Sequence, residues 1–313
     1  MRVVVLDDYQ EVAVNCADWA SLNCHITFLS KHLAERSQLV EALEGVDVVV
    51  AMRERTPFDA DLFDSLPALN LLVTTGMRNA AIDLDAAERN GVVVCGTASP
   101  GHATAELTFA LVQLLARGLH TEAESVRTGA WQVGLGSDLR GATLGLIGLG
   151  RLGSQVARFG AAFGMDVVAW SENLTEERAS ECGVLAVSQQ QLLESSDFVS
   201  IHVRLSDRTR GLIGPQELAR MKSSAYLINT SRGPIVDEHA LLEAVRSDEL
   251  AGAAIDVFDN EPLPVDHPFR REPRIFSTPH IGYVTRQTYE VFYSHAVEDI
   301  AAWMDGAPMR LLT

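Results

Sequence analysis

The stretch that decides the fold is Thr143-Leu144-Gly145-Leu146-Ile147-Gly148-Leu149-Gly150-Arg151-Leu152-Gly153. Residues 143–147 form an apolar run of strand length, and a helix-like pattern begins within the glycine motif. In this context Gly148 permits a tight turn, Gly150 lets a pyrophosphate approach the backbone, and Gly153 lets helix and strand pack closely. Negative charge is favoured at the helix N-terminus that follows. The stretch predicts a dinucleotide-binding turn, although tight strand–helix turns also use glycine for purely structural reasons.

Short apolar runs, separated by helix-like segments, recur on both sides of this motif and predict β/α units on parallel sheets. The expected strands are residues 3–6, 26–29, 46–51, 71–75, 92–95, 143–147, 166–170, 198–202, 225–229, 252–257 and 275–278. The expected helices are residues 34–43, 84–89, 104–117, 152–163, 189–193, 215–220, 238–246 and 287–303. Residues 118–140, which include Trp131, are interpreted as a polar excursion that contacts another subunit.

Length and composition restrict the class of protein. A chain of 313 residues exceeds one typical domain, so two domains are expected. The balance of 47% hydrophobic and 21% charged residues is typical of a soluble globular protein. A net charge of −17 argues against nucleic acid or an anionic membrane as partner. The four cysteines lack zinc-like spacing, and neither a signal peptide nor a membrane span is visible, so we expect a cytoplasmic protein without a metal.

The residue after the second strand of the nucleotide-binding unit bears on the choice of cofactor. A carboxylate there would bind the ribose 2′-hydroxyl of NAD and repel the extra phosphate of NADP. Here Asp166-Val167-Val168-Ala169-Trp170 is followed by Ser171 and then Glu172. Ser171 removes the repulsion, but no arginine follows directly, and Glu172 could partly substitute for the missing acid. The sequence therefore favours NAD and leaves NADP possible.

Three chemistry-bearing residues each follow a predicted strand, namely Arg232, Glu261 and His280. Ligands of open parallel sheets bind beyond the carboxyl ends of the strands, so these side chains are expected near the glycine turn. An arginine can hold a carboxylate or polarise a carbonyl, a histidine can exchange a proton near neutrality, and a glutamate can fix the histidine tautomer. Taken singly, each residue could instead belong to a surface loop, a turn or a structural contact. Together they predict reduction of a 2-oxo acid.

Four longer stretches are similar to a known family. Residues 227–238, 253–258, 261–264 and 278–282 (LINTSRGPIVDE, AAIDVF, EPLP and TPHIG) resemble the D-isomer-specific 2-hydroxyacid dehydrogenases. The resemblance implies hydride transfer between NAD(P) and a small D-2-hydroxy acid or 2-oxo acid. It also implies that Arg232 binds the substrate, His280 is the acid/base and Glu261 orients His280.

The same resemblance implies a fold class, a domain arrangement and a set of cofactor contacts. The fold would be α/β, with two doubly wound Rossmann/flavodoxin-like domains. The dinucleotide-binding domain, residues 101–284, would be inserted into a substrate domain made of residues 1–100 and 285–313. Members are usually homodimers. The implied cofactor-binding residues are Thr104, Gly148, Gly150, Arg151, Leu152, Gly153, Ser171, Val203, Thr230, Ser231 and Asp256.

The chain departs from the family pattern at a loop of the predicted substrate domain. Residues 75–83 read TGMRNAAID, with Met77, Arg78 and Asn79 where small residues and an acid are common. Gly76, Met77 and Arg78 would still offer backbone amides to the substrate carboxylate. Arg78, together with Arg53, could also bind a second anionic group of the substrate. The alternative is that both arginines are solvated or paired with acids such as Glu54.

A different functional class has the same motifs. Corepressor-like proteins that resemble these dehydrogenases bind NAD(H) for assembly or sensing without significant turnover, and they retain the three polar residues. The compact length of the chain favours the enzyme. Oxidation of formate or phosphonate on the same scaffold is a further alternative, for which the sequence shows no specific feature.

Overall fold

The computed structural model describes residues 1–312, and the chain divides into two compact units. The first unit combines residues 1–100 with the C-terminal segment that begins at Val284, and the second unit comprises residues 101–283. The second unit is therefore an insertion between two segments of the first. None of the helices within residues 1–312 has the length and apolar character needed to cross a membrane.

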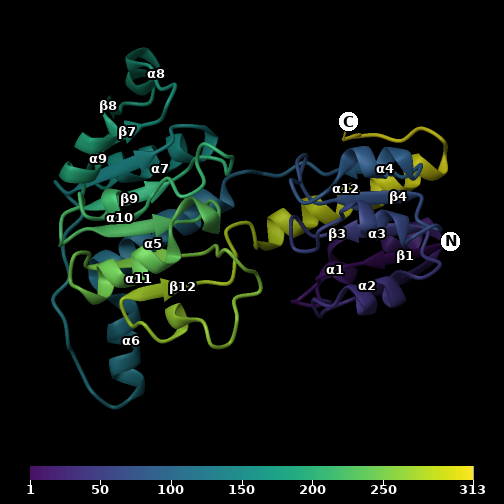
Figure 1. The fold of residues 1–313 in the computed structure, drawn as a ribbon, viewed down its shortest axis with the longest axis horizontal. Helices are drawn as coiled ribbons and strands as arrows, with labels where there is room; N and C mark the ends of the chain where they lie inside the picture. Colours follow the sequence, from purple (N-terminus) through teal and green to yellow (C-terminus); the bar gives the residue numbers. More distant parts are fainter. Residues whose placement is uncertain (313) are drawn as a thin grey trace. The chain divides into compact units, whose positions relative to one another are not determined.

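The first unit is built on a five-stranded parallel sheet with the order β2-β1-β3-β4-β5 (Figure 1). This is the flavodoxin-like order, which bears out the predicted fold class for this unit. The central strands are buried along their whole length, which explains why they appear in the sequence as unbroken apolar runs. The strands are β1 (Arg2–Val5), β2 (His25–Phe28), β3 (Val48–Ala51), β4 (Leu71–Thr74) and β5 (Val93–Gly96).

Helices from both ends of the chain complete this unit. Leu39, Leu43, Leu62 and Phe63 belong to a core that also contains Val49 and Leu72 of the sheet. The C-terminal helix α12 (Arg286–Met304) contacts β4, and its fully buried Tyr293 ring lies 5.9 Å from that of Trp19. The remaining helices of the unit are α1 (Ala13–Cys16), the 3-10 helix η1 (Trp19–Leu22), α2 (Arg36–Leu43), α3 (Ala60–Asp64) and α4 (Leu84–Arg89).

The second unit contains a seven-stranded parallel sheet with the order β12-β11-β10-β9-β6-β7-β8 (Figure 1). Counted from β6 as the first strand, this is the Rossmann order extended by one strand at the end. The predicted fold class is confirmed here as well. The strands are β6 (Thr143–Ile147), β7 (Asp166–Trp170), β8 (Leu185–Ala186), β9 (Phe198–Ile201), β10 (Tyr226–Asn229), β11 (Gly252–Ile255) and β12 (Ile275–Ser277).

Successive residues of these strands point to two separate cores. On β10, Leu227 joins a core with side chains of three helices, α9 (Gln189–Ser195), α10 (Pro215–Leu218) and α11 (Glu238–Arg246). The next residue, Ile228, joins the other core, with side chains of α5 (Ala103–Arg117), α7 (Arg151–Ala162) and α8 (Glu176–Glu181). Both faces of the sheet are thus covered, and only its edges and strand ends are left for ligands.

The structure also contains elements that the sequence did not predict. Helix α6 (Leu119–Arg127) occupies the first part of the predicted polar excursion, and β8 has only two residues. Helices α1, α3 and α8 have four to six residues, too few to establish a hydrophobic period. Six predicted strands were one or two residues too long; for example, β9 ends at Ile201 instead of His202, and β11 ends at Ile255 instead of Val257.

Candidate active site

The predicted site residues of the second unit follow the ends of parallel strands. Because β6, β7, β9, β10, β11 and β12 run in one direction, their carboxyl ends meet at one edge of the sheet. The residues that follow these six strands, in strand order, are Gly148, Ser171, Val203, Arg232, Asp256 and His280, with Thr230 and Ser231 between β10 and Arg232. The structure therefore brings these residues of the second unit to a common edge.

The glycine turn between β6 and α7 has the close contacts that the motif predicts. Gly148 has φ +102°, in the region that favours glycine, and a Cβ there would lie 2.9 Å from the backbone of His202. A Cβ on Gly153 would overlap the carbonyl oxygen of Gly148. These two glycines therefore let the turn and the helix approach each other.

The space beside Gly150 differs from that beside the other two glycines of the motif, Gly148 and Gly153. This space shows whether a dinucleotide fits. A Cβ built on Gly150 would meet no atom within 4 Å, so the space in front of its backbone is open. Gly150 is also the N-cap of α7, and no side chain caps this helix of twelve residues. The N–H groups of the first helical turn have no partner within the helix and can bind an anion. The turn has the form and the donors that a pyrophosphate requires.

His202, directly after β9, was assigned to a strand by sequence and was not predicted as a site residue. Its Nε2 lies 2.9 Å from the hydroxyl of Ser200, and its backbone abuts Gly148. Burial lowers the pKa of His202 from its ordinary value of 6.5 to about 4. His202 is therefore a neutral support of the glycine turn near neutral pH.

We expect this buried imidazole to make the second unit sensitive to acid. Below pH 6.5 the unfolded chain protonates His202, whereas the folded chain resists protonation down to about pH 4. Stability is therefore lost as pH falls through this window, by about 2 kcal/mol between about pH 7 and about pH 5. Urea unfolding at the two pH values measures the loss. His202→Gln keeps a polar group but cannot titrate, and an equal loss in this variant would contradict the assignment.

His280 and Glu261 form a hydrogen-bonded pair. Nδ1 of His280 lies 2.6 Å from Oε2 of Glu261, and the side chains are 19% and 30% exposed. Because a carboxylate only accepts, Nδ1 carries the hydrogen. The other oxygen of Glu261 accepts the backbone N–H of Phe258 at 2.9 Å. Within residues 1–312, Nε2 of His280 has no hydrogen-bond partner, so it is the nitrogen that can serve a ligand.

Arg232 is held in a loop that contacts the Glu261 loop. Its backbone oxygen accepts from the side chain of Asn229 at 2.9 Å, and its Nη1 donates to the Ser231 carbonyl at 2.7 Å. A Cβ on Gly233 would overlap the backbone of Phe258 and Asp259. Only glycine permits this approach, which fixes the arginine loop against the loop that carries the glutamate.

Asp256 is fully buried and organises the segment around His280. It accepts from the hydroxyl of Thr278 at 2.6 Å and from the N–H groups of Ile281 and Gly282 at 2.9 and 2.8 Å. Burial raises the pKa of Asp256, and these hydrogen bonds oppose the rise. A Cβ on Gly282 would lie 3.0 Å from Thr104, so this predicted residue lies beside the same segment.

The loop predicted to bind the substrate carboxylate belongs to the first unit. Gly76 has φ +91°, and its N–H already donates to the Thr97 hydroxyl at 2.8 Å. Within residues 1–312 the N–H groups of Met77 and Arg78 donate to no protein acceptor, so both are available to a ligand.

Arg53 and Arg78, the two arginines predicted near this loop, differ in whether their side chains are already paired. Arg53 donates to the Thr75 carbonyl at 3.1 Å and pairs with Glu54 at 3.5 Å, which is the alternative that the sequence left open. Arg78 is exposed and forms no ion pair within residues 1–312. Of the two side chains, Arg78 is the one available to a second anionic group.

The glycine turn, the His–Glu pair and the arginine loop have a match among known families. A family model described as "D-isomer specific 2-hydroxyacid dehydrogenase, NAD binding domain" matches residues 109–282. This is more than half of the chain. The chain belongs to the D-isomer specific 2-hydroxyacid dehydrogenase family. The predicted family is confirmed, and the matched domain makes NAD(H) its cofactor.

Relatives within this family support the assignment. The chain is 40% identical to a glyoxylate reductase from Aeropyrum pernix over 260 residues, 79% of this chain and 77% of the relative. It is 35% identical to a D-3-phosphoglycerate dehydrogenase from Bacillus subtilis over 287 residues, 91% of this chain but only 54% of that protein. The crystal structure of a phosphoglycerate oxidoreductase from Vibrio cholerae matches with a TM-score of 0.92 and 34% identity, over 98% of this chain and all of that one.

These names bear on the functional class. The relatives are named as dehydrogenases, reductases and oxidoreductases, so the family prediction of an NAD-dependent enzyme is confirmed, and the corepressor-like alternative gains no support.

Several supporting residues of this 2-hydroxyacid dehydrogenase escaped sequence reasoning. Glu238 on α11 accepts the N–H of Asp259 at 3.0 Å and lies 3.2 Å from Nε2 of His267, which steadies the loop before Glu261. Thr108 on α5 shares a hydrogen bond of 2.7 Å with Thr230, a predicted cofactor residue that follows β10. Each contact joins residues more than twenty positions apart, so no local pattern could have revealed it.

Proposed function

We propose that the protein reduces a small 2-oxo acid to the D-2-hydroxy acid with NADH, and catalyses the reverse reaction with NAD. The observation that carries the proposal is the 2.6 Å hydrogen bond between Glu261 and Nδ1 of His280, which leaves Nε2 to face a ligand. The pair lies at the strand edge that also carries Arg232 and the glycine turn.

In this reaction His280 transfers the proton and Glu261 stabilises the charge of the imidazole ring. When bound, NADH supplies the hydride to the carbonyl carbon. The Nε2–H of protonated His280 donates a proton to the oxo oxygen, so that the carbonyl gains a hydride and a proton and becomes an alcohol. Glu261 holds the ring in place and stabilises its positive charge before the proton leaves. In the oxidation direction, neutral His280 accepts the hydroxyl proton.

Arg232 is the proposed substrate anchor. A guanidinium presents a planar fork of donors, which suits a carboxylate and the adjacent oxo group. In the first unit, the N–H groups of Met77 and Arg78, which have no protein acceptor within residues 1–312, are proposed as donors to a substrate carboxylate. Gly76 and Arg53 would shape this loop, since Gly76 has a left-handed backbone and Arg53 is bonded to Thr75.

The remaining unit-two residues are proposed cofactor ligands. Gly148, Gly150, Gly153, Arg151 and Leu152 would surround the pyrophosphate. The proposed ligands at the other strand ends are Thr104, Ser171, Val203, Thr230, Ser231 and Asp256, with Asp256 near the nicotinamide carboxamide.

An assay of NADH oxidation tests the function. Glyoxylate, hydroxypyruvate and pyruvate form the panel, and at least one is expected to be reduced. The product is then checked with a chiral column for the D isomer where the product is chiral. A preparation that binds NADH and turns over none of a broad set of 2-oxo acids would refute the proposal.

We also propose that Arg78 favours substrates with a second anionic group, in keeping with the D-3-phosphoglycerate named for one relative. For an exposed arginine an ion pair contributes up to about 1 kcal/mol, or about fivefold in KM. Arg78→Ala is therefore expected to raise KM about fivefold for phosphorylated hydroxypyruvate and to leave KM for glyoxylate nearly unchanged. Equal losses on both substrates would sink the idea. Arg89→Ala, on α4 of the same unit, is the control.

A homodimer is proposed from the excursion after α6. Trp131, Val133 and Leu135 are 73%, 57% and 100% exposed, which is unusual for a run of large apolar side chains. Burying one leucine contributes roughly 1.5–3 kcal/mol, so Leu135→Asp is expected to weaken dimerisation at least about tenfold. Sedimentation velocity over a range of concentrations measures this effect. Val265→Asp removes an apolar residue that is 89% exposed elsewhere on the chain, and this variant should dimerise normally. A wild-type chain that stays monomeric would contradict the proposal.

A further inference from the structure

Asn79 lies in the loop after β4, at one of the positions where the chain departs from the family pattern. Its Nδ2 donates to the backbone carbonyl of Arg53 at 2.6 Å, and its Oδ1 accepts the backbone N–H of Ala81 at 2.9 Å. Nδ2 also donates to the hydroxyl of Thr74 at 2.9 Å. Because a carbonyl only accepts and a backbone N–H only donates, these partners fix the orientation of the amide. One side chain therefore joins the segment after β3, the end of β4 and its own loop.

The backbone of Arg53 is bonded to this loop through both of its polar groups. Its N–H donates to the hydroxyl of Thr75 at 2.9 Å, and its carbonyl accepts from Asn79. Arg53 has φ +51°, a left-handed conformation that persists in a residue other than glycine only where its surroundings hold it. The hydrogen bonds from Thr75 and Asn79 are such surroundings. The segment after β3 and the loop after β4 therefore support each other.

The loop is held on both sides of its two available donors. On one side the buried Gly76 donates its N–H to the hydroxyl of Thr97 at 2.8 Å. On the other side Asn79 makes its three hydrogen bonds. The residues between them, Met77 and Arg78, are exposed, and their N–H groups have no protein acceptor within residues 1–312. The position of these two donors is therefore set by the hydrogen bonds at either end of the loop.

We propose that Asn79 is a positioning residue for the substrate carboxylate. Through its bonds to Arg53 and Thr74 it holds the loop in one shape, so that the N–H groups of Met77 and Arg78 are ordered before an anion binds. A loop that is already ordered loses less conformational entropy on binding, and this raises the affinity for the ligand. The inference rests on the proposed function, which assigns these N–H groups to the carboxylate, and it adds the residue that fixes them.

Binding of oxamate, an unreactive analogue of a 2-oxo acid, tests the proposal. Calorimetric titration of the NADH complex with oxamate gives its Kd. Asn79→Ala removes all three hydrogen bonds and should raise this Kd about tenfold, the loss expected when a hydrogen bond to a charged group is weakened. The Kd of NADH, and kcat at saturating 2-oxo acid, should each change less than about twofold, a separation that general unfolding would not produce. Asn90→Ala removes two side-chain hydrogen bonds in the same unit and should alter none of these values.

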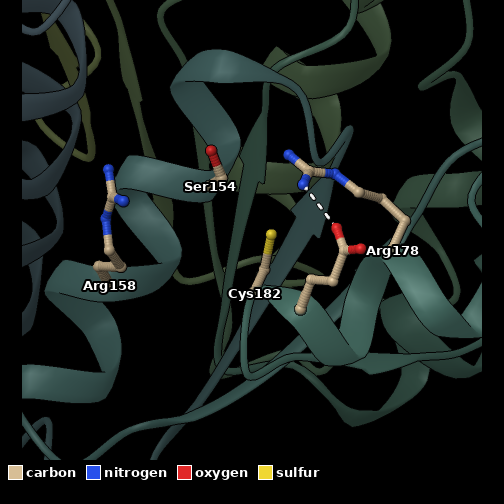
Figure 2. A pocket seen from close by; sticks show the side chains of 5 residues that line it. Ser154, Arg158, Arg178 and Cys182 are labelled. Atoms are coloured by element: carbon tan, nitrogen blue, oxygen red, sulfur yellow. Dashed lines mark hydrogen bonds and ion pairs between the residues drawn. The ribbon is translucent and has the colours of Figure 1, made fainter.

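Oxamate is a small anion, so a second cationic region provides a further control. A pocket between α7 and α8 also presents guanidinium groups. Figure 2 shows Arg158 and Arg178 on opposite sides of this pocket, with Ser154 and Cys182 between them. Arg158→Ala removes one guanidinium group and should leave the Kd of oxamate unchanged. If Arg158→Ala raised this Kd as much as Asn79→Ala, oxamate would be bound in the pocket and the proposal would be overturned.

Thr74→Val is a second variant that decides the question if Asn79→Ala does not fold. It removes one partner of Asn79 and keeps the shape of a buried side chain, so the Kd of oxamate should rise about threefold. Wild-type oxamate binding in folded Asn79→Ala, or in Thr74→Val if the first variant does not fold, would overturn the proposal, as would an equal loss of NADH binding. Weaker oxamate binding by these variants, without turnover of any 2-oxo acid by the wild type, would support the positioning role and refute only the proposed reaction.

Discussion

Replacing His280 with asparagine is expected to lower kcat for 2-oxo acid reduction by about 10²- to 10⁴-fold, the usual contribution of a positioned general acid. The asparagine side chain retains a hydrogen-bond donor toward Glu261 but cannot transfer a proton. The structure supports this because Glu261 occupies Nδ1 at 2.6 Å, so that Nε2 is the nitrogen available to the substrate. Steady-state kinetics with NADH and the preferred substrate of the panel measure the loss.

Two controls give this result its meaning. NADH affinity, measured by fluorescence, should change less than about twofold in His280→Asn, since the glycine turn is untouched. His239→Asn alters an exposed histidine on α11 and should leave kcat unchanged. A His280→Asn enzyme with more than about a tenth of wild-type kcat would assign the proton transfer to another group.

Arg232→Gln is the second change with a large expected effect. Loss of one partner from a hydrogen-bonded charge pair costs roughly 2–5 kcal/mol, so kcat/KM should fall between about 30-fold and several thousand-fold. A planar fork cannot be reproduced by one ammonium group, so Arg232→Lys should recover only part of the loss. The kinetics of both variants over a range of substrate concentrations separate KM from kcat.

A measurement of NADH binding by the Arg232→Gln variant can contradict the role of Arg232 as substrate anchor. If Arg232→Gln weakens NADH binding as much as it lowers kcat/KM, the arginine supports the cofactor site or the fold. Arg220→Gln, at an exposed arginine after α10, is the matched control and should behave as wild type.

The fold could be predicted because buried parallel strands appear in the sequence as apolar runs of fixed length. The runs at Val48–Ala51 and Leu71–Thr74 are buried at every position, and their one polar residue, Thr74, is the last of its strand. Short elements were missed for the opposite reason, since β8 and α3 have two and five residues and cannot show a period. The doubly wound fold class, which sequence spacing alone does not determine, came from the family resemblance.

The sequence predicted which residues follow the strand ends of the site, but it did not predict their backbone conformations or side-chain contacts. Arg232 and His280 follow buried strands, and parallel strands bring such residues to one edge. The left-handed backbone of His280, with φ +52°, has no sequence signal because histidine is not the usual residue there. The pairing of Arg53 with Glu54 and the use of the Gly76 N–H by Thr97 depend on side-chain directions, which only coordinates supply.

The insertion of one unit within the other has a consequence for the order in which the protein is made. All the strands of the second unit lie within residues 101–283, so its sheet can close before α12 is synthesised. The first unit must wait longer, because α12, with the buried Tyr293, follows the second unit in the chain and is synthesised after it. Until then the face of β4 that α12 contacts stays open to water. The nucleotide-binding unit is thus the part of the nascent chain that can first hold its ligand.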